Sequence, residues 1–311
     1  MTDHHCFIVS SLSVDAQLQF LFVSNLTLLL CGTLLSVGTL TGNVLILLAV
    51  LITKTLRKPI IYLMCSLSAT HIFWSLSHLS FYTAARVDEL ATKAFCFEEQ
   101  RFFLFSFFMC AYLPTTLGNL VIISLERYNA VKRPIQHRAS MTKERALKMI
   151  ALVWVTVFFT QVAKVLIFES PTKGVLVSVV VSVILIIVII VAQLGICRAS
   201  RRQSANFPGQ EAVIRAIQLR SQKVSKEVRK MLLSLILGFG PLLLTAVIKM
   251  GFKVDYVFLI SPWVMLVVTF NSAVNTYIHL NGNNETRQAI KNIIRCRRRN
   301  AAVVPLRPHT T

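Results

Sequence analysis

Seven long apolar stretches constrain this chain more than any other feature of its sequence. A helix needs about 20 apolar residues to cross the hydrocarbon core of a bilayer, and only helices or closed barrels satisfy all their backbone polar groups there. With 55% hydrophobic and 15% charged residues, the chain has too few polar side chains to cover a soluble surface. The predicted spans are 25–51, 60–85, 102–124, 150–168, 175–196, 231–248 and 256–280.

The basic residues indicate how these spans are oriented. The formal net charge is +20, and 26 of the 33 Lys and Arg residues fall in the tail and in the loops after the first, third and fifth spans. Positively charged loops stay in the cytoplasm. We therefore expect a multi-pass plasma-membrane protein with its N-terminus outside and its C-terminus in the cytoplasm. The basic residues do not form a face interleaved with aromatic residues, so we expect no nucleic-acid partner.

The expected organisation is an all-α, seven-transmembrane helix bundle followed by a short amphipathic helix parallel to the membrane. Residues 1–24 form an extracellular N-terminus, 25–280 the bundle, 281–299 the juxtamembrane helix and 300–311 a disordered cytoplasmic tail. The juxtamembrane helix would place Ala289, Ile290 and Ile293 on one face, with basic residues beside them, which is typical of a helix at the lipid interface. Cys296, in a basic juxtamembrane setting, is a palmitoylation candidate; an unmodified thiol is the alternative.

Just after the third predicted span, 102–124, come Glu126-Arg127-Tyr128 and then Pro134. A carboxylate beside an arginine at the membrane edge holds the guanidinium, and release of that pair frees a permanent cation to reach a partner. The alternative is an ordinary interfacial ion pair, since arginine often extends to the membrane surface.

A wider set of motifs resembles the rhodopsin-like (class A) G-protein-coupled receptors. Glu126-Arg127-Tyr128 is similar to the family's acid-Arg-Tyr motif, Gly42-Asn43-Val44 to the motif of its first span, Trp154 to the tryptophan of its fourth, and 271–279 to the pattern that ends its seventh. The resemblance implies an extracellular ligand and a heterotrimeric G protein as partners. It implies a coupling and activation switch at Glu126, Arg127, Tyr128, Asn275 and His279, and helix-packing or switch roles for Asn43, His71, Trp154, Phe239 and Pro241.

The chain also departs from the family at several of these positions. His71 stands where the family has an Asp that helps to bind sodium, and neutral imidazole is a poor ligand for a hard cation. Thr276 replaces the family's Pro in the seventh span, His279 replaces its Tyr, and Phe239 replaces its Trp in the sixth. The family's usual extracellular disulfide lacks its cysteine in the third span. Cys6 and Cys96 could pair instead, with two free thiols as the alternative.

The ligand is constrained mainly by exclusion. Residues 102–124 contain no acid that could anchor an amine, and 256–280 contain no lysine for a retinal Schiff base. The outer third span is rich in Phe, which favours a small apolar or odorant-like ligand contacting Phe105, Met109, Leu113 and Met265, although such residues also face lipid or core. The chain resembles odorant-type receptors; a melanocortin-like peptide receptor and a poorly signalling decoy or scaffold are alternatives. Without HExxH, GxSxG or metal-ligand spacing, we expect no enzyme, cofactor or metal.

Overall fold

The computed structural model describes residues 14–92, 99–167, 171–206, 226, 228–241, 244, 257–282 and 284–302. All regular structure in these ranges is helical. The main helices are α1 (Val14–Ile52), α2 (Pro59–Ser77), α3 (Thr83–Thr92), α4 (Glu99–Lys132), α6 (Lys143–Ile167), α7 (Pro171–Asn206) and α9 (Val257–Gly282). Residues 228–241 form a further helical segment. A 3-10 turn, η1 (Lys54–Leu56), and a helix of seven residues, α5 (Pro134–Ser140), lie between them, and α10 (Asn284–Ala302) follows α9.

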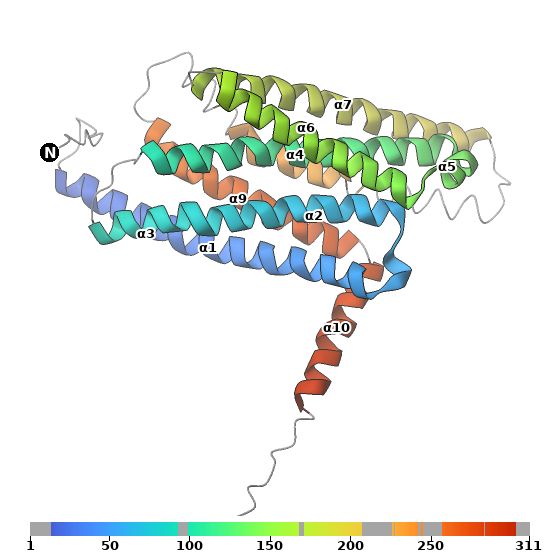
Figure 1. The fold of residues 1–311 in the computed structure, drawn as a ribbon, viewed down its shortest axis with the longest axis horizontal. Helices are drawn as coiled ribbons and strands as arrows, with labels where there is room; N and C mark the ends of the chain where they lie inside the picture. The colour runs from blue at the N-terminus through green and yellow to red at the C-terminus, as the bar shows by residue number, and fades with distance from the viewer. Residues whose placement is uncertain are drawn as a thin grey trace, which may run out of the picture.

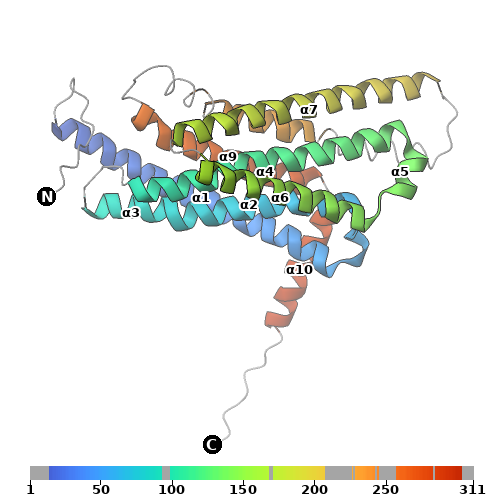
Figure 2. The same cartoon turned by 45° about the horizontal axis from the view of Figure 1, so that its top comes forward.

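The long helices run side by side as one bundle (Figures 1 and 2). A π-helical turn, η2 (His78–Tyr82), joins α2 to α3, so these three elements form one continuous column. With 228–241 as part of the sixth column, the bundle has the seven columns that the apolar stretches predict. Helix α10 leaves the bundle at a steep angle to the other helices (Figure 1), as a membrane-parallel helix would.

Within the described residues, four helical stretches are long and apolar enough to cross a membrane: Leu18–Ile52, Pro59–Thr92, Lys143–Lys164 and Leu176–Ala199. Their outward faces expose large apolar side chains, among them Leu34 at 74%, Leu152 at 66% and Val191 at 63%. A soluble protein rarely presents so large an apolar surface. Lipid is the environment that such a surface fits.

Several helices continue beyond the spans expected from hydropathy. Helix α1 begins at Val14 rather than at residue 25, and α7 continues to Asn206 through a polar stretch that we expected to be loop. The reason is that a helix satisfies its own backbone hydrogen bonds and does not require apolar side chains. Hydropathy therefore marks the edge of the lipid and not the end of the helix.

Three aromatic side chains fill the centre of the bundle. Tyr112 of α4 stacks on Trp74 of α2 with ring centroids 4.7 Å apart, and its ring lies 5.7 Å from that of Phe239. None of the three is more than 1% exposed. Burial of aromatic rings in such pairs is a large contribution to stability. This aromatic core sets the positions of α2, α4 and the segment 228–241 around the polar groups described below.

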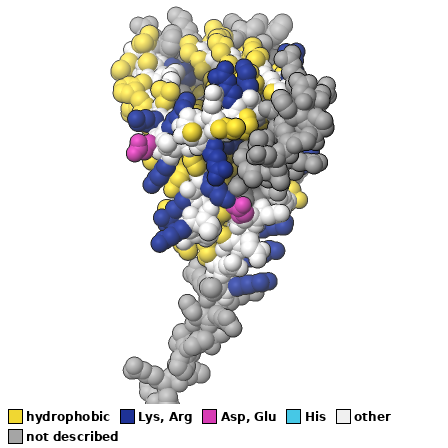
Figure 3. Space-filling model, turned by 90° about the vertical axis from the view of Figure 1, so that its right-hand side faces the viewer, with side chains coloured by type: hydrophobic (Ala, Val, Ile, Leu, Met, Phe, Trp, Pro, Cys, Tyr) yellow, Lys and Arg dark blue, Asp and Glu magenta, His cyan; other side chains and the backbone are white. Residues whose placement is uncertain are grey.

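One end of the bundle, called the basic end here, carries η1, α5 and the beginning of α10. Seen from this end, Lys and Arg side chains gather on the surface with very few acids among them (Figure 3). Exposed basic residues of this end are Lys54, Arg57, Lys132, Arg133, Arg138, Lys143, Arg145 and Lys148. The surface available here is thus strongly cationic.

Candidate functional site

An ion pair lies at the basic end of α4. Glu126 is 4% exposed and Arg127 is 7% exposed, and the Nε and Nη2 groups of Arg127 donate to the two carboxylate oxygens of Glu126. His137 of α5 places its Nε2 atom 3.1 Å from Oε1 of the same carboxylate. The cluster Glu126–Arg127–His137 therefore joins the end of α4 to the short helix that follows it.

The local sequence explains why His137 comes back to the cluster. Arg133 leaves the helical conformation (φ −139°, ψ 70°), and Pro134 then starts α5, where its missing N–H costs nothing. The turn folds α5 against α4. Arg127 donates to both carboxylate oxygens of Glu126. This pairing holds the guanidinium close to the helix and away from the surrounding cationic surface. A partner that takes Arg127 must first break this pair.

Tyr128 occupies the contact between α4 and α7. A Cβ atom on Gly195 of α7 would lie 2.8 Å from Cε2 of Tyr128, so only glycine admits the ring at this point. The ammonium of Lys132 lies 5.3 Å from the centroid of the same ring, within the range of a cation–π contact. Tyr128 thus links the ion pair to the packing of α7.

A second polar contact joins α1 to α9. Asn43 donates from Nδ2 to the hydroxyl of Thr276 at 2.7 Å and to the carbonyl of Thr39 at 2.9 Å. The two helices can approach this closely because Gly42 has no Cβ. A Cβ at this position would lie only 2.8 Å from Cγ2 of Thr276. Thr276 stands where we noted a proline in the related receptors, and here its hydroxyl supplies the acceptor for Asn43.

Replacing Thr276 by Val is expected to lower the free energy of unfolding by about 1–3 kcal/mol, because the buried amide of Asn43 loses one of its two acceptors. SDS titration of the purified protein in mixed micelles measures this change. Thr276→Ser keeps the hydroxyl and serves as the matched control. Equal stability of the Val and Ser variants would show that the hydrogen bond to Asn43 contributes nothing.

His71 bridges three helices in the centre of the bundle. Its Nδ1 atom lies 3.0 Å from the hydroxyl of Tyr112 on α4 and 2.9 Å from that of Ser272 on α9. Its Nε2 atom is buried and has no hydrogen-bond partner among the described residues. Where the family has a carboxylate, this chain has an imidazole held by two hydroxyl groups.

The basic-end half of α9 contains further buried polar groups. Asn275 is 1% exposed, and neither atom of its amide has a hydrogen-bond partner within the described ranges. Asn271 accepts from Ser234 at 2.6 Å, next to Gly238, where a Cβ would lie 2.7 Å from that of Asn271. His279 is 4% exposed. Buried polar groups are nearly always paired, so the orphan amide of Asn275 marks a position that requires an explanation.

The structure places the remaining packing candidates at separate points. Trp154 of α6 donates from Nε1 to the hydroxyl of Ser66 on α2 at 3.0 Å, which ties these helices together. Phe239 belongs to the aromatic core. Pro241 is exposed, and the residues directly after it lie outside the described ranges.

The candidate ligand contacts are only partly described. Leu113 is 6% exposed and belongs to the apolar core, and Met265 packs against that core. The side chains of Phe105, Met109 and Cys296, and the residues Cys6 and Cys96, lie outside what the structure describes. The proposed contact of a ligand with these four apolar side chains stays a prediction.

The sequence alone did not predict that the side chains of His137 and Ser272 take part in these contacts, or that the hydroxyl of Thr276 accepts a hydrogen bond. Each is polar, and two of them lie on α9 in a largely apolar span. Polar side chains inside an apolar span are costly unless they find partners, which was the available signal. The spacing of Pro134 and His137 gave no indication that α5 folds back on Glu126.

The fold and these contacts define a bundle of seven membrane helices with buried polar contacts between them. Over 87% of its length the chain superposes on 85% of squid rhodopsin in its crystal structure, with a TM-score of 0.75 and 15% identity, which establishes the fold. Residues 42–174 match the sequence family described as 7 transmembrane receptor (rhodopsin family). Over these residues, less than half of its length, the chain is similar to this family of receptors.

Individual receptors match parts of the chain. It is 28% identical to 5-hydroxytryptamine receptor 7 of Xenopus laevis over 146 residues, which is 45% of this chain and 33% of that receptor. It is 28% identical to melanocortin receptor 3 of Mus musculus over 123 residues (39% and 38%). It is 35% identical to the D(1B) dopamine receptor of Mus musculus over 124 residues (39% and 25%). The matches thus span about a third of the length of these relatives.

Proposed function

We propose that the protein is a plasma-membrane receptor that binds a small apolar ligand from outside the cell and activates a heterotrimeric G protein at its basic end. The observation that carries this proposal is the Glu126–Arg127–His137 cluster beside an exposed cationic surface. A buried, permanently charged arginine held by a neighbouring carboxylate is a group with two states, paired and released. The basic loops support an orientation with this end in the cytoplasm.

The contacts between helices supply a route from ligand to switch. The aromatic core Trp74–Tyr112–Phe239 lies next to His71, which contacts Ser272 on α9. Asn275 is on the same helix as Ser272, less than one turn further toward the basic end, and its amide has no hydrogen-bond partner among the described residues. Movement of the segment 228–241 against Tyr112 and Asn271 would therefore alter contacts along α9.

Replacing Arg127 by Ala is expected to reduce G-protein activation at least ten-fold, while leaving surface expression largely intact. Nucleotide exchange on a panel of G proteins, in membranes from cells exposed to odorants and lipids, measures the activity. Arg138→Ala is the matched control, because Arg138 is an exposed arginine of the same end. Undiminished signalling by Arg127→Ala would contradict the mechanism.

A second candidate function is a receptor that keeps the fold and signals poorly. The observation in its favour is that Thr276, His279 and Phe239 all depart from the family at positions of its switch. A chain that reaches the cell surface but activates no G protein, even with ligand bound, would favour this function. Reversion of Thr276 to Pro and His279 to Tyr is then expected to restore signalling.

A further inference from the structure

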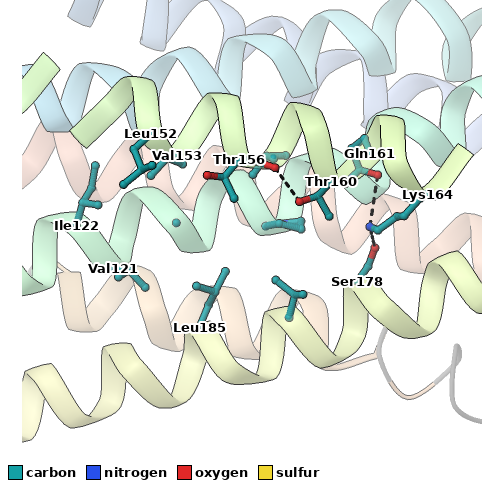
Figure 4. Close-up of a pocket in the computed structure, with 14 residues that line it drawn as sticks. Val121, Ile122, Leu152, Val153, Thr156, Thr160, Gln161, Lys164, Ser178 and Leu185 are labelled. Carbon is teal, nitrogen blue, oxygen red and sulfur yellow. Dashed lines mark hydrogen bonds between the residues drawn. The ribbon is translucent and has the colours of Figure 1, made fainter. Parts of the chain in front are cut away.

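An apolar cleft of about 200 Å³ opens between α4, α6 and α7. Figure 4 shows its walls: Ile122 of α4, Leu152 and Val153 of α6, and Leu185 of α7 line its length. Leu152 is 66% exposed, so the cleft opens on the outer side of the bundle, where lipid lies. The aromatic core around Tyr112 does not contribute to it.

One end of this cleft is polar and contains a cation. Lys164 is 9% exposed, and its ammonium donates to the hydroxyl of Ser178 and, at 3.4 Å, to the side-chain oxygen of Gln161 (Figure 4). In the part of the chain that the structure describes, no carboxylate forms a salt bridge with Lys164. A lysine near a helix end usually extends to water, whereas this one is held inside the cleft.

A proline in α4 explains why the polar end is built here. Pro114 has no N–H, so the carbonyl of Cys110 one turn earlier loses its donor within the helix. Gln161 of α6 supplies a replacement, donating from Nε2 to that carbonyl at 2.9 Å. The amide is fixed by this bond, and its oxygen is left facing Lys164. Residues of three helices thus hold the ammonium in place.

We propose that this cleft binds a long-chain fatty acid, with its carboxylate on Lys164 and its acyl chain along Ile122 and Leu185. Among the described residues the hydrogen-bond partners of this buried cation are neutral, and an anionic head would add a matching charge. The cleft is smaller than the pockets that enclose drug-sized ligands, so it accommodates one chain rather than the two of a phospholipid. The fatty acid would enter sideways from the leaflet away from the basic end.

Photolabelling of the full-length protein in phosphatidylcholine nanodiscs tests this proposal without any signalling readout. The probe is a long-chain fatty acid that carries a diazirine in its chain, and labelled peptides are mapped by mass spectrometry. We expect label on α4, α6 and α7 around the cleft. Unlabelled fatty acid should displace the probe, and the alcohol of equal length should do so about ten-fold less well, because it lacks the charge.

Variants separate the cation from the shape of the cleft. Lys164→Gln is expected to weaken labelling about ten-fold, Lys164→Arg to retain it, and Leu185→Trp to block it by filling the cleft. Lys143→Gln, at the other end of α6, is the matched control and should label normally. Each variant is first compared with the native protein by size-exclusion chromatography and thermal unfolding, so that a misfolded variant is not counted.

Three results would overturn the proposal. The first is equal labelling of well-folded Lys164→Gln and native protein, and the second is label spread evenly over all lipid-facing helices. The third is displacement by phosphatidylglycerol but not by fatty acid, which would assign the cleft to a phospholipid headgroup.

Discussion

Replacing Glu126 by Gln is expected to raise ligand-independent G-protein activation about ten-fold. In the native protein the carboxylate holds Arg127 through two charged hydrogen bonds and also contacts His137 at 3.1 Å. Loss of a charge-assisted hydrogen bond costs about 1.5–3 kcal/mol, and the cost falls on the paired state alone. The equilibrium then shifts toward the state with Arg127 released. Nucleotide exchange without added ligand, normalised to surface expression, measures the change.

Two further variants test whether the ion pair itself restrains basal activity. His137→Ala removes only one contact with Glu126 and should raise basal activity less than Glu126→Gln does. Glu144→Gln is the matched control, because Glu144 is an exposed acid at the start of α6. Basal activity that is unchanged in Glu126→Gln, in a preparation that still responds to ligand, would show that the ion pair does not restrain the receptor.

Replacing Arg86 by Met is expected to lower the free energy of unfolding by about 3–5 kcal/mol, because it removes a largely buried cation that pairs with the carboxylate of Glu89. The side chains of Arg86 and Glu89 are only 7% and 12% exposed, and the pair is 2.7 Å apart. Asn25 of α1 accepts from Arg86 and donates to Glu89, both at 2.9 Å. This cluster fastens α3 to α1 at the end of the bundle opposite the basic end.

An exposed ion pair in the same protein provides the comparison. Lys58 and Glu285 are also 2.9 Å apart, but their side chains are 38% and 50% exposed. Lys58→Met should therefore change stability by about 1 kcal/mol or less. SDS titration in mixed micelles measures both variants. A loss in Arg86→Met no larger than that in Lys58→Met would mean that burial does not strengthen the Arg86 pair.

Much of the fold could be predicted because the bilayer imposes a simple rule on sequence. Apolar stretches of sufficient length indicated the helices and their order. The mixed pattern at 281–299 predicted a separate amphipathic helix, and α10 spans Asn284–Ala302. The ordered motifs from Asn43 to Asn275 indicated the family. Helix ends were less predictable, as α1 and α7 demonstrate, since polar residues continue a helix as readily as apolar ones.

The candidate site was predicted less completely. Glu126 and Arg127 are neighbours in sequence, so their pairing could be proposed directly. His71, Tyr112 and Ser272 lie on three helices far apart in the chain, and no local pattern could bring them together. The same holds for Asn43 and Thr276, where the departure from the family turned out to supply a hydrogen-bond acceptor.

The sequence by itself determined that this chain is a bundle of membrane helices with a cationic end, because hydropathy and charge are properties of single residues and short runs. Only the tertiary structure decided which polar side chains meet inside the bundle. Those partners depend on the rotation of each helix about its own axis and on close approaches at Gly42, Gly195 and Gly238. The placement of Lys164 at the end of an apolar cleft is of the same kind, since it depends on a carbonyl that Pro114 leaves without a donor in another helix.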